Sequence, residues 1–179
     1  MIDPRAGIGE GVSIGPYCVV EGDVLIGDGC RLASHVILKG RSSLGPQCVV
    51  EDGAILGGRP QHVAHTTQPG SLRIGRGNTI RENVTIHTAL NADEATTVGD
   101  GNLIMVNAHI AHDCEVGNQC IMANNVLLSG HVSVDDRAFR SGAAAVHQFC
   151  RIGRFAMVGG QAHIVQDVPP YVTVDGLSS

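Results

Sequence analysis

The sequence contains no tryptophan, and it has only three phenylalanines and two tyrosines among 179 residues. Hydrophobic residues nevertheless make up 43% of the chain, which is enough for one domain with a sizeable core. That core has to be packed from valine, isoleucine and leucine. The 24 glycines indicate many tight turns.

Positive charge is also scarce. Twelve lysines and arginines face 17 acids, giving a formal net charge of −5, so no broad basic surface for nucleic acid or an anionic membrane is expected. No apolar stretch approaches the roughly 18 residues of a membrane span, and the start, MIDPRAGIGEG, lacks the basic and apolar segments of a signal peptide. We therefore expect a soluble, cytoplasmic protein.

The cysteines form no CxxC pair and no zinc-ligand spacing. All six stand at multiples of six in the numbering, which indicates a repeated packing slot rather than a disulfide framework. They are Cys18, Cys30, Cys48, Cys114, Cys120 and Cys150.

A six-residue repeat, or hexad, runs along the chain. Of the 27 positions reached by steps of six from Ile8 to Ile164, 23 hold Ile, Val, Leu or Met. A small or β-branched residue follows four positions later in most repeats, and glycine often follows the large residue directly. A period of six fits neither a helix nor a long strand. It predicts an all-β parallel β-helix, a triangular prism in which each face takes one hexapeptide and each coil about 18 residues, giving about nine coils.

The positions that break the repeat predict where the chain leaves the prism. His62 and Gln68 fall in a polar segment at 58–70, and Ala92 falls in another at 88–96, so both segments are expected to be external loops. Neither loop shifts the phase. We expect a β-helix domain over residues 1–168, and a terminal segment, 169–179, that leaves the prism because Pro169-Pro170 cannot donate ladder hydrogen bonds.

The segment NAHIAHDC places two histidines three apart, with an acid after the second. In the six-residue phase His109 and His112 fall outside the core, as do His131 and His147. The steps from His109 to His131 and from His131 to His147 are each close to one coil, so the four histidines are expected to cluster on one outer strip. Histidine clusters can bind metal, and some carbonic anhydrases with this kind of β-helix hold zinc by three histidines. Their pattern has two histidines five apart, so the spacing of three here favours general-base chemistry without a metal.

With the hexads, the segments NAHIAHDC, GHVSVDD, AVHQF and QDVPPYV make the chain resemble the UDP-N-acetylglucosamine O-acyltransferases, which catalyse the first step of lipid A biosynthesis. The resemblance covers essentially all 179 residues. It implies a homotrimer of left-handed β-helices with active sites between subunits. It also implies transfer of a 3-hydroxyacyl group from acyl carrier protein to the sugar 3-hydroxyl of UDP-N-acetylglucosamine, with no metal and no cofactor.

The same resemblance implies roles for particular residues. His112 is similar to the general base, Asp113 to the carboxylate that orients it, and Gly130 to the donor of a backbone N–H to the thioester oxyanion. A further group matches positions that bind the sugar and phosphates, namely His109, His131, His147 and Gln148. Met157 and Gly160 match positions at the far end of the acyl groove.

The chain departs from the family in three places: the first loop, the C-terminal end and Arg140. The family has an acid after Pro-Gln in its first loop, whereas Pro60-Gln61 is followed here by His62, which alters that sugar contact. The family also continues into a C-terminal helical domain, so the chain is either a fragment or a short homologue. Two other functions stay open: a hexapeptide acyltransferase using another nucleotide sugar or an acyl-CoA, and a non-catalytic trimeric scaffold.

Arg140 also breaks the six-residue repeat, but it lies outside the two loops and puts a charge in an inward position. Its stem could lie along the core while its head reaches water, or the coil could be distorted locally. Alternatively, Arg140 could join Arg137, Arg151 and Arg154 in a basic patch for the acidic carrier protein or for phosphates.

Overall fold

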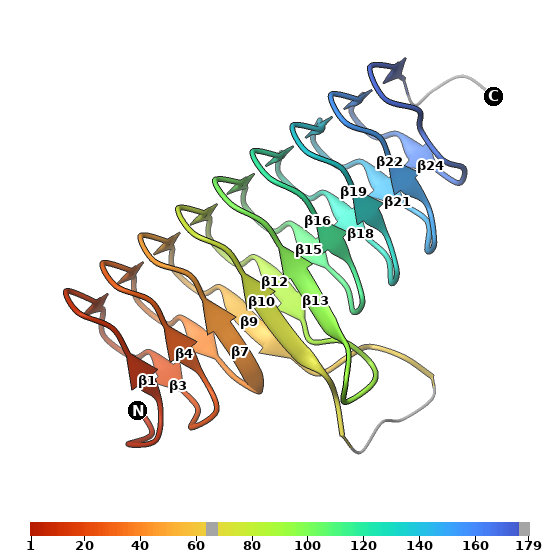
Figure 1. Cartoon of the computed structure of the whole chain (residues 1–179). Coiled ribbons are helices and arrows are strands. Elements are labelled where there is room, and N and C mark those ends of the chain that lie inside the picture. The colour runs from red at the N-terminus through yellow and green to blue at the C-terminus, as the bar shows by residue number, and fades with distance from the viewer. Residues whose placement is uncertain (64–67, 176–179) are drawn as a thin grey trace.

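The computed structural model describes residues 1–63 and 68–175, which form a prism of stacked coils running from the N-terminus to the C-terminus (Figure 1). These residues form only short strands and turns, and most strands are two residues long. No helix in this part of the chain is long and apolar enough to cross a membrane.

Consecutive strands belong to three different parallel sheets, so each sheet receives every third strand. Sheet A contains β3 (Val19–Val20), β6 (Ile37–Leu38), β9 (Ile55–Gly58), β12 (Thr85–His87), β15 (His109–Ile110), β18 (Leu127–Leu128), β21 (Ala145–Val146) and β24 (His163–Ile164). Sheet B contains β1 (Gly7–Ile8), β4 (Leu25–Ile26), β7 (Arg41–Leu44), β10 (Ser71–Ile74), β13 (Ala95–Val98), β16 (Glu115–Val116), β19 (Ser133–Val134) and β22 (Arg151–Ile152). Sheet C contains β2 (Ser13–Ile14), β5 (Arg31–Leu32), β8 (Val49–Val50), β11 (Thr79–Ile80), β14 (Leu103–Ile104), β17 (Ile121–Met122), β20 (Phe139–Arg140), β23 (Met157–Val158) and β25 (Thr173–Val174). The predicted all-β, left-handed parallel β-helix is confirmed.

The hexad explains both the core and the corners. The second residue of each short strand points inward, and Val20, Leu38 and Leu56 are at most 2% exposed. At most corners one residue adopts left-handed backbone, with φ between 54° and 67° for the non-glycine residues. This conformation costs an L-residue about 1 kcal/mol. Hydrogen bonds to the coils on either side offset that cost.

The cysteines occupy the small inward position at these corners, and all six are free thiols. Their Sγ atoms donate to a turn carbonyl of the next coil, as from Cys18 to Ala33 O at 3.0 Å and from Cys114 to Ser129 O at 3.1 Å. Burial raises the pKa of the Cys114 thiol to about 12, so it stays protonated and unreactive. The predicted packing role is confirmed.

Two long connections leave the prism and return in phase. One joins β9 to β10 and the other joins β12 to β13, and they lie side by side at one end of sheet B in Figure 1. Their backbones meet where Gly70 N donates to Ala89 O at 2.8 Å. Stacked residues are normally 18 apart, but Ser43 pairs with Arg73, and Arg73 pairs with Thr97. The insertions therefore amount to two hexads and one hexad, and whole hexads keep every inward position inward.

The coil continues beyond residue 168, where the sequence predicted that it would end. β25 pairs with β23 in sheet C, and Met157 N donates to Val172 O at 2.9 Å. Pro169-Pro170 falls in the turn before β25, where the ladder needs no N–H from either residue. The prolines therefore mark a corner and do not end the coil.

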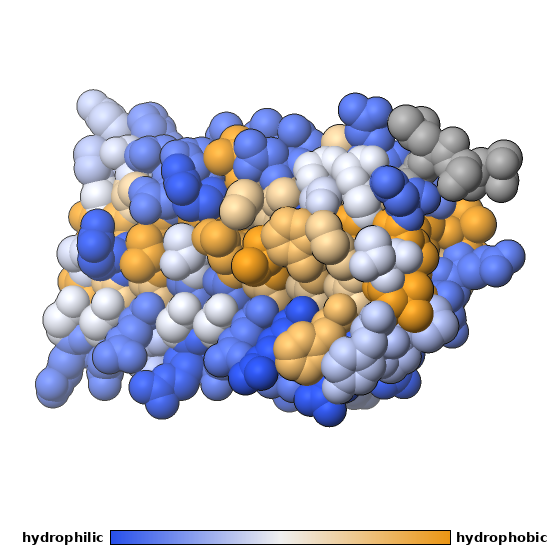
Figure 2. Space-filling model, turned by 90° about the horizontal axis from the view of Figure 1, so that it is seen from above, coloured by the Kyte–Doolittle hydropathy of each residue, from blue (hydrophilic) through white to orange (hydrophobic). Residues whose placement is uncertain are grey.

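The outward faces of the sheets differ in polarity. Sheet B presents mainly polar side chains, among them Arg73, Thr97 and Glu115. Sheet C presents a mainly apolar row from β8 to β23, listed in chain order as Val49, Thr79, Leu103, Ile121, Phe139 and Met157. Figure 2 shows hydrophobic residues gathered in a band along the middle of one face, with hydrophilic residues along both margins. A face of this kind is typical of a surface that is covered by another protein.

Arg140 lies in the middle of the core. It is 0% exposed, and none of its three side-chain nitrogens has a hydrogen-bond partner among the described residues. Burial lowers the pKa of the guanidinium to about 10. The expectations that its head group reaches water or joins the other arginines are wrong, because the inward position in the narrow prism keeps it from both. The coil is not distorted either, since Arg140 pairs in register with Met122 of β17 and Val158 of β23.

We predict that Arg140→Ile raises the melting temperature by roughly 4 to 10 °C. It removes an unpaired buried cation, which costs on the order of several kcal/mol, and it restores the aliphatic position. Thermal unfolding followed by circular dichroism measures this. Arg73→Ile on exposed sheet B is the matched control and should change the melting temperature little; an Arg140→Ile protein no more stable than wild type would contradict the prediction.

Candidate active site

Three residues 18 apart stack on one another at the corner between sheets A and B. They are Asp113, His131 and Phe149, and each has left-handed backbone, with φ of 59°, 60° and 67°. The His131 ring stacks on the Phe149 ring with centroids 4.7 Å apart. On its other side, His131 Nε2 lies 3.7 Å from Asp113 Oδ2. The corner column therefore holds a carboxylate, an imidazole and an aromatic ring in order.

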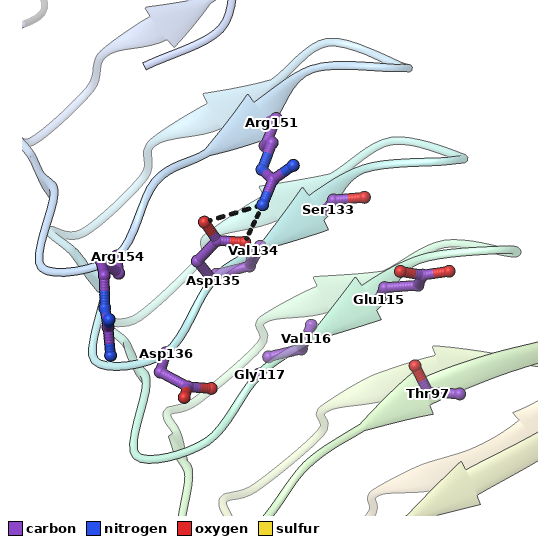
Figure 3. Close-up of a pocket in the computed structure, with 10 residues that line it drawn as sticks. All are labelled: Thr97, Glu115, Val116, Gly117, Ser133, Val134, Asp135, Asp136, Arg151 and Arg154. Carbon is purple, nitrogen blue, oxygen red and sulfur yellow. Dashed lines mark hydrogen bonds and ion pairs between the residues drawn. The ribbon is translucent and has the colours of Figure 1, made fainter. Parts of the chain in front are cut away.

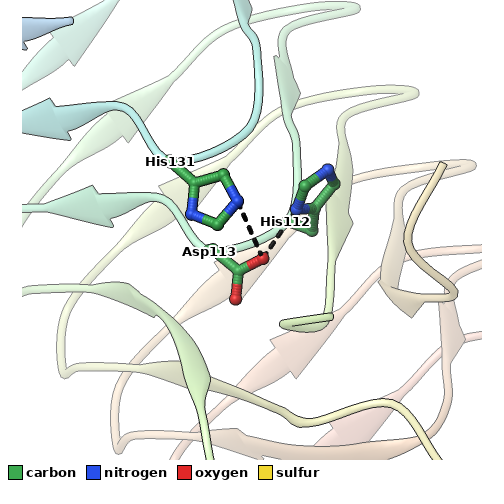
Figure 4. Close-up of side chains that lie close together, drawn as sticks. All are labelled: His112, Asp113 and His131. Atoms are coloured by element: carbon green, nitrogen blue, oxygen red, sulfur yellow. Dashed lines mark hydrogen bonds and ion pairs between the residues drawn. The ribbon is translucent and has the colours of Figure 1, made fainter. Parts of the chain in front are cut away.

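His112 and Asp113 form a short hydrogen bond at this corner (Figure 4). His112 Nδ1 lies 2.6 Å from Asp113 Oδ2, and the two side chains are only 6% and 8% exposed. Because an ionised carboxylate can only accept, Nδ1 carries the proton, and Nε2 of the neutral ring keeps its lone pair. His112 is thus more deeply buried than the sequence predicted, since the next coil covers it.

The loop between β12 and β13 holds the carboxylate in place. Leu90 N donates to both Asp113 oxygens, at 3.2 Å each, and Asp113 N donates to Thr96 Oγ1 at 2.8 Å. The first two bonds hold the carboxylate, and the third holds the backbone of Asp113 against β13. The orientation of the imidazole therefore depends on a loop as well as on the prism.

Gly130 stands one coil after His112 and leaves room for its ring. A Cβ at Gly130 would lie 2.6 Å from His112 Cε1 and 2.8 Å from Nε2. Among the described residues, the Gly130 N–H has no protein acceptor. Position 130 therefore combines close approach to His112 with a free backbone donor.

A hollow of about 470 Å³ opens on the exposed side of this pair. Its lining brings together residues from sheet A, the A–B corner and the loop after β9: Gln61, His62, Val63, His109, Ala111, His112, Leu127, Leu128, Ser129, Gly130 and Gln148. The His62 ring meets the His112 ring edge-on, with centroids 5.3 Å apart. The hollow is large enough for a small polar ligand in contact with His112.

His109 is held by two residues of β12. Its Nδ1 lies 2.7 Å from Thr85 Oγ1, and its ring meets the His87 ring at 4.8 Å. Burial, with His109 and His112 nearby, lowers the pKa of His87 to about 4. Burial also lowers the pKa of His109. Both rings are therefore neutral at physiological pH.

Not all of the residues named from the sequence meet here. The structure gathers His62, His109, His112, His131 and Gln148 with Asp113 and Gly130. It leaves His147 exposed, with Nδ1 3.2 Å from Gln148 O. Met157 lies on sheet C and Gly160 at the corner between sheets C and A, outside the lining of the hollow. In one subunit the expected strip of four histidines is a cluster of three.

Four residues of the site were missed in the sequence: Thr85, His87, Leu90 and Thr96. Thr85 stacks on His109 because the loop after β12 adds one hexad to the usual step of 18, so the step is 24. The contact between Thr85 and His109 could have been predicted from the sequence, since both loops preserve the six-residue phase. The contact from Leu90 N has no signal in residue type, because it is made by the backbone.

The cluster of His112, Asp113 and His131 offers three metal-ligating atoms within 4.8 Å of one another. Two ligand atoms of one tetrahedral zinc are about 3.3 Å apart, given bonds of about 2.0 to 2.2 Å. The 2.6 Å between His112 Nδ1 and Asp113 Oδ2 is shorter. This geometry is that of a hydrogen-bonded pair, and metal binding would require the two groups to separate.

Comparison with known proteins gives a consistent result. The family described as bacterial transferase hexapeptide (six repeats) matches residues 5–40 and 95–130. LpxA from Acinetobacter baumannii is 40% identical, with a TM-score of 0.95, and the Arabidopsis UDP-N-acetylglucosamine acyltransferase is 39% identical, with a TM-score of 0.86. The chain belongs to the UDP-N-acetylglucosamine acyltransferase family.

LpxA from Moraxella catarrhalis is a third such acyltransferase, 41% identical with a TM-score of 0.92. Each of these three matches covers 98% of this chain and 69% of the other. The solved acyltransferases are therefore longer than this chain. The matched part of each includes the whole prism and the corner that carries His112.

We predict that Gly130→Ala lowers turnover about a hundredfold with little change in melting temperature. The added methyl group displaces the His112 ring, and a shift of about 1 Å at a reacting group costs this much. The backbone at Gly130 is not left-handed, so alanine adds no backbone strain there and its effect comes from the contact with His112. Gly142→Ala is the control, because its Cβ would meet only Asn124 O at 3.4 Å. Turnover is measured by steady-state kinetics of acyl transfer, and an equal loss of turnover in both variants would contradict the prediction.

Proposed function

We propose that this protein transfers a 3-hydroxyacyl group from acyl carrier protein to the 3-hydroxyl of UDP-N-acetylglucosamine. The observation that carries the proposal is the His112–Asp113 pair, with Nε2 of His112 facing the hollow beside Gly130. Membership of the acyltransferase family supplies the substrate class.

In the proposed reaction His112 is the general base. Nε2 accepts the proton of the sugar 3-hydroxyl as its oxygen attacks the thioester carbonyl carbon. Asp113, bonded to Nδ1, stabilises the imidazolium that forms and holds the ring in orientation. The carbon–sulfur bond then breaks, and the carrier thiolate leaves and takes the proton from His112.

Gly130 contributes to the same step through its backbone. Its N–H has no acceptor among the described residues and lies beside the His112 ring, so it can donate to the oxyanion of the tetrahedral intermediate. His62, His109 and Gln148 line the hollow and would contact the sugar nucleotide. His131 packs against His112 with ring centroids 5.2 Å apart and so restricts its movement.

We propose that the active protein is a homotrimer. The apolar row of sheet C, including Ile121 and Phe139, would be buried between neighbouring prisms. This arrangement would also account for His147, Met157 and Gly160, which lie away from the hollow of their own subunit. They would contact substrate and the far end of the acyl chain in a site shared with a neighbour.

We predict that sedimentation equilibrium at micromolar concentration gives the mass of three chains. Ile121→Glu places a charge in the apolar row and should shift the distribution toward monomer. Thr97→Glu, on the polar face of sheet B, is the control and should leave the trimer intact. A wild-type monomer would contradict the trimer and the shared site.

We predict that His112→Ala lowers kcat by about two orders of magnitude or more, the usual contribution of a positioned general base. Asp113→Asn should cost less, about tenfold, because the base remains. The assay incubates the protein with 3-hydroxyacyl carrier protein and UDP-N-acetylglucosamine and measures the acylated sugar nucleotide by mass spectrometry. Wild-type activity in a folded His112→Ala protein would remove the central claim, and no product from wild type would remove the proposed function.

A further inference from the structure

The basic side chains of this acidic chain are unevenly distributed. After Arg81 the sequence has no lysine or arginine until Arg137, which is the first of four arginines that end with Arg154. One of them, Arg140, is buried. The other three, Arg137, Arg151 and Arg154, are exposed on the last coils, at or beside the corner between sheets B and C.

Two of these arginines surround an exposed aromatic ring. The guanidinium carbons of Arg137 and Arg154 lie 5.5 and 5.8 Å from the centroid of Phe155. The Phe155 ring in turn stacks on Tyr171, with centroids 5.3 Å apart and planes 14° from parallel. We call these four residues the arginine–aromatic patch. Phe155 and Tyr171 are 41% and 69% exposed, a large aromatic surface for a chain with five such residues.

The charge of the patch is not neutralised within the chain. Arg151, on neighbouring β22, is paired with Asp135, with Nη2 3.0 Å from Oδ1 (Figure 3). Arg154 stands apart from that pair across a hollow of about 510 Å³. Neither Arg137 nor Arg154 forms an ion pair with another described residue. Arg137 donates only Nε, to Gln119 Oε1 at 2.7 Å, so its two terminal amino groups remain available.

We propose that the arginine–aromatic patch is the docking surface for the acidic acyl carrier protein, a proposal that rests on the proposed function. Two unpaired guanidinium groups held beside one ring are suited to carboxylates spaced along a protein surface. The chain as a whole carries a charge of −5 and would repel an acidic partner, so a local basic surface is needed for association. Phe155 and Tyr171 supply the apolar centre that such an interface requires.

Charge complementarity favours a protein over the nucleotide at this surface. Tyr171 and the two guanidinium groups already pack around the Phe155 ring, which leaves little of that ring for a nucleobase. A flat, exposed basic corner suits a protein surface better.

The test compares Arg137→Gln/Arg154→Gln with Arg73→Gln/Arg76→Gln, a control that removes the same charge from exposed arginines elsewhere. Each protein is assayed with two donors: the 3-hydroxyacyl carrier protein and the same acyl chain on free pantetheine, which needs no docking. KM for the carrier-protein donor should rise about tenfold in the patch variant only and should depend on salt in wild type. KM for the pantetheine donor, KM for UDP-N-acetylglucosamine and kcat should stay unchanged.

Three results would overturn the docking surface: an unchanged KM for the carrier-protein donor, an equal rise in the control, or a rise in KM for UDP-N-acetylglucosamine instead. If wild type transfers no acyl group from either donor, the proposed function fails. Docking is then read from fluorescence anisotropy with labelled holo carrier protein. Binding that is tenfold weaker in the patch variant supports the surface, and equal or absent binding in all proteins overturns it.

Discussion

Every coil of this protein is held to the next by backbone hydrogen bonds that connect residues one coil apart, such as Ser13 N to Cys30 O at 3.0 Å and Gly15 N to Leu32 O at 2.8 Å. The ladder fixes the length of a coil at three hexads, so residues 18 apart in sequence are neighbours in space. At the corners, side chains donate hydrogen bonds to backbone carbonyls that the ladder leaves without a donor. At several corners a cysteine thiol donates to such a carbonyl. Where asparagine occupies the cysteine position its amide donates instead, as Asn78 Nδ2 does to Gly75 O and Gly99 O at 2.9 Å each. Small polar corner residues thus close a core that has almost no aromatic side chains.

The candidate site depends directly on this ladder. Asp113, His131 and Phe149 meet because each occupies the left-handed corner position of successive coils. His112 and Gly130 meet one position earlier for the same reason, and the missing side chain at 130 makes space for the ring. A different coil length would separate the His112 ring from both Gly130 and His131. The geometry of the candidate site therefore depends more on a constant repeat length than on any one buried side chain.

The fold was predictable because large aliphatic residues recur every six positions, and the pairing of His112 with Asp113 follows from their adjacency. The limits of sequence reasoning have physical causes. Arg140 was expected to reach water because burying an unpaired guanidinium is unfavourable, yet the ladder on both sides holds its backbone in the inward orientation. The prolines at 169 and 170 were expected to end the coil, but corner residues need no ladder N–H. His147 was placed with the other histidines from approximate spacings, whereas stacking in these coils follows a step of 18, which puts Phe149 rather than His147 on His131.

The two loops show how such a regular scaffold acquires a specific site. Insertions of two hexads and one hexad return the chain in phase, so they leave the inward positions of the core unchanged. Both reach the same corner: His62 from the first loop meets the His112 ring, and Leu90 N from the second bonds both oxygens of Asp113. The first places the His62 ring against the His112 ring, and the second holds the Asp113 carboxylate with a backbone donor that hardly depends on residue type. A substitution at His62 can therefore alter the lining of the hollow while the Leu90 N–H keeps the Asp113 carboxylate in place beside His112.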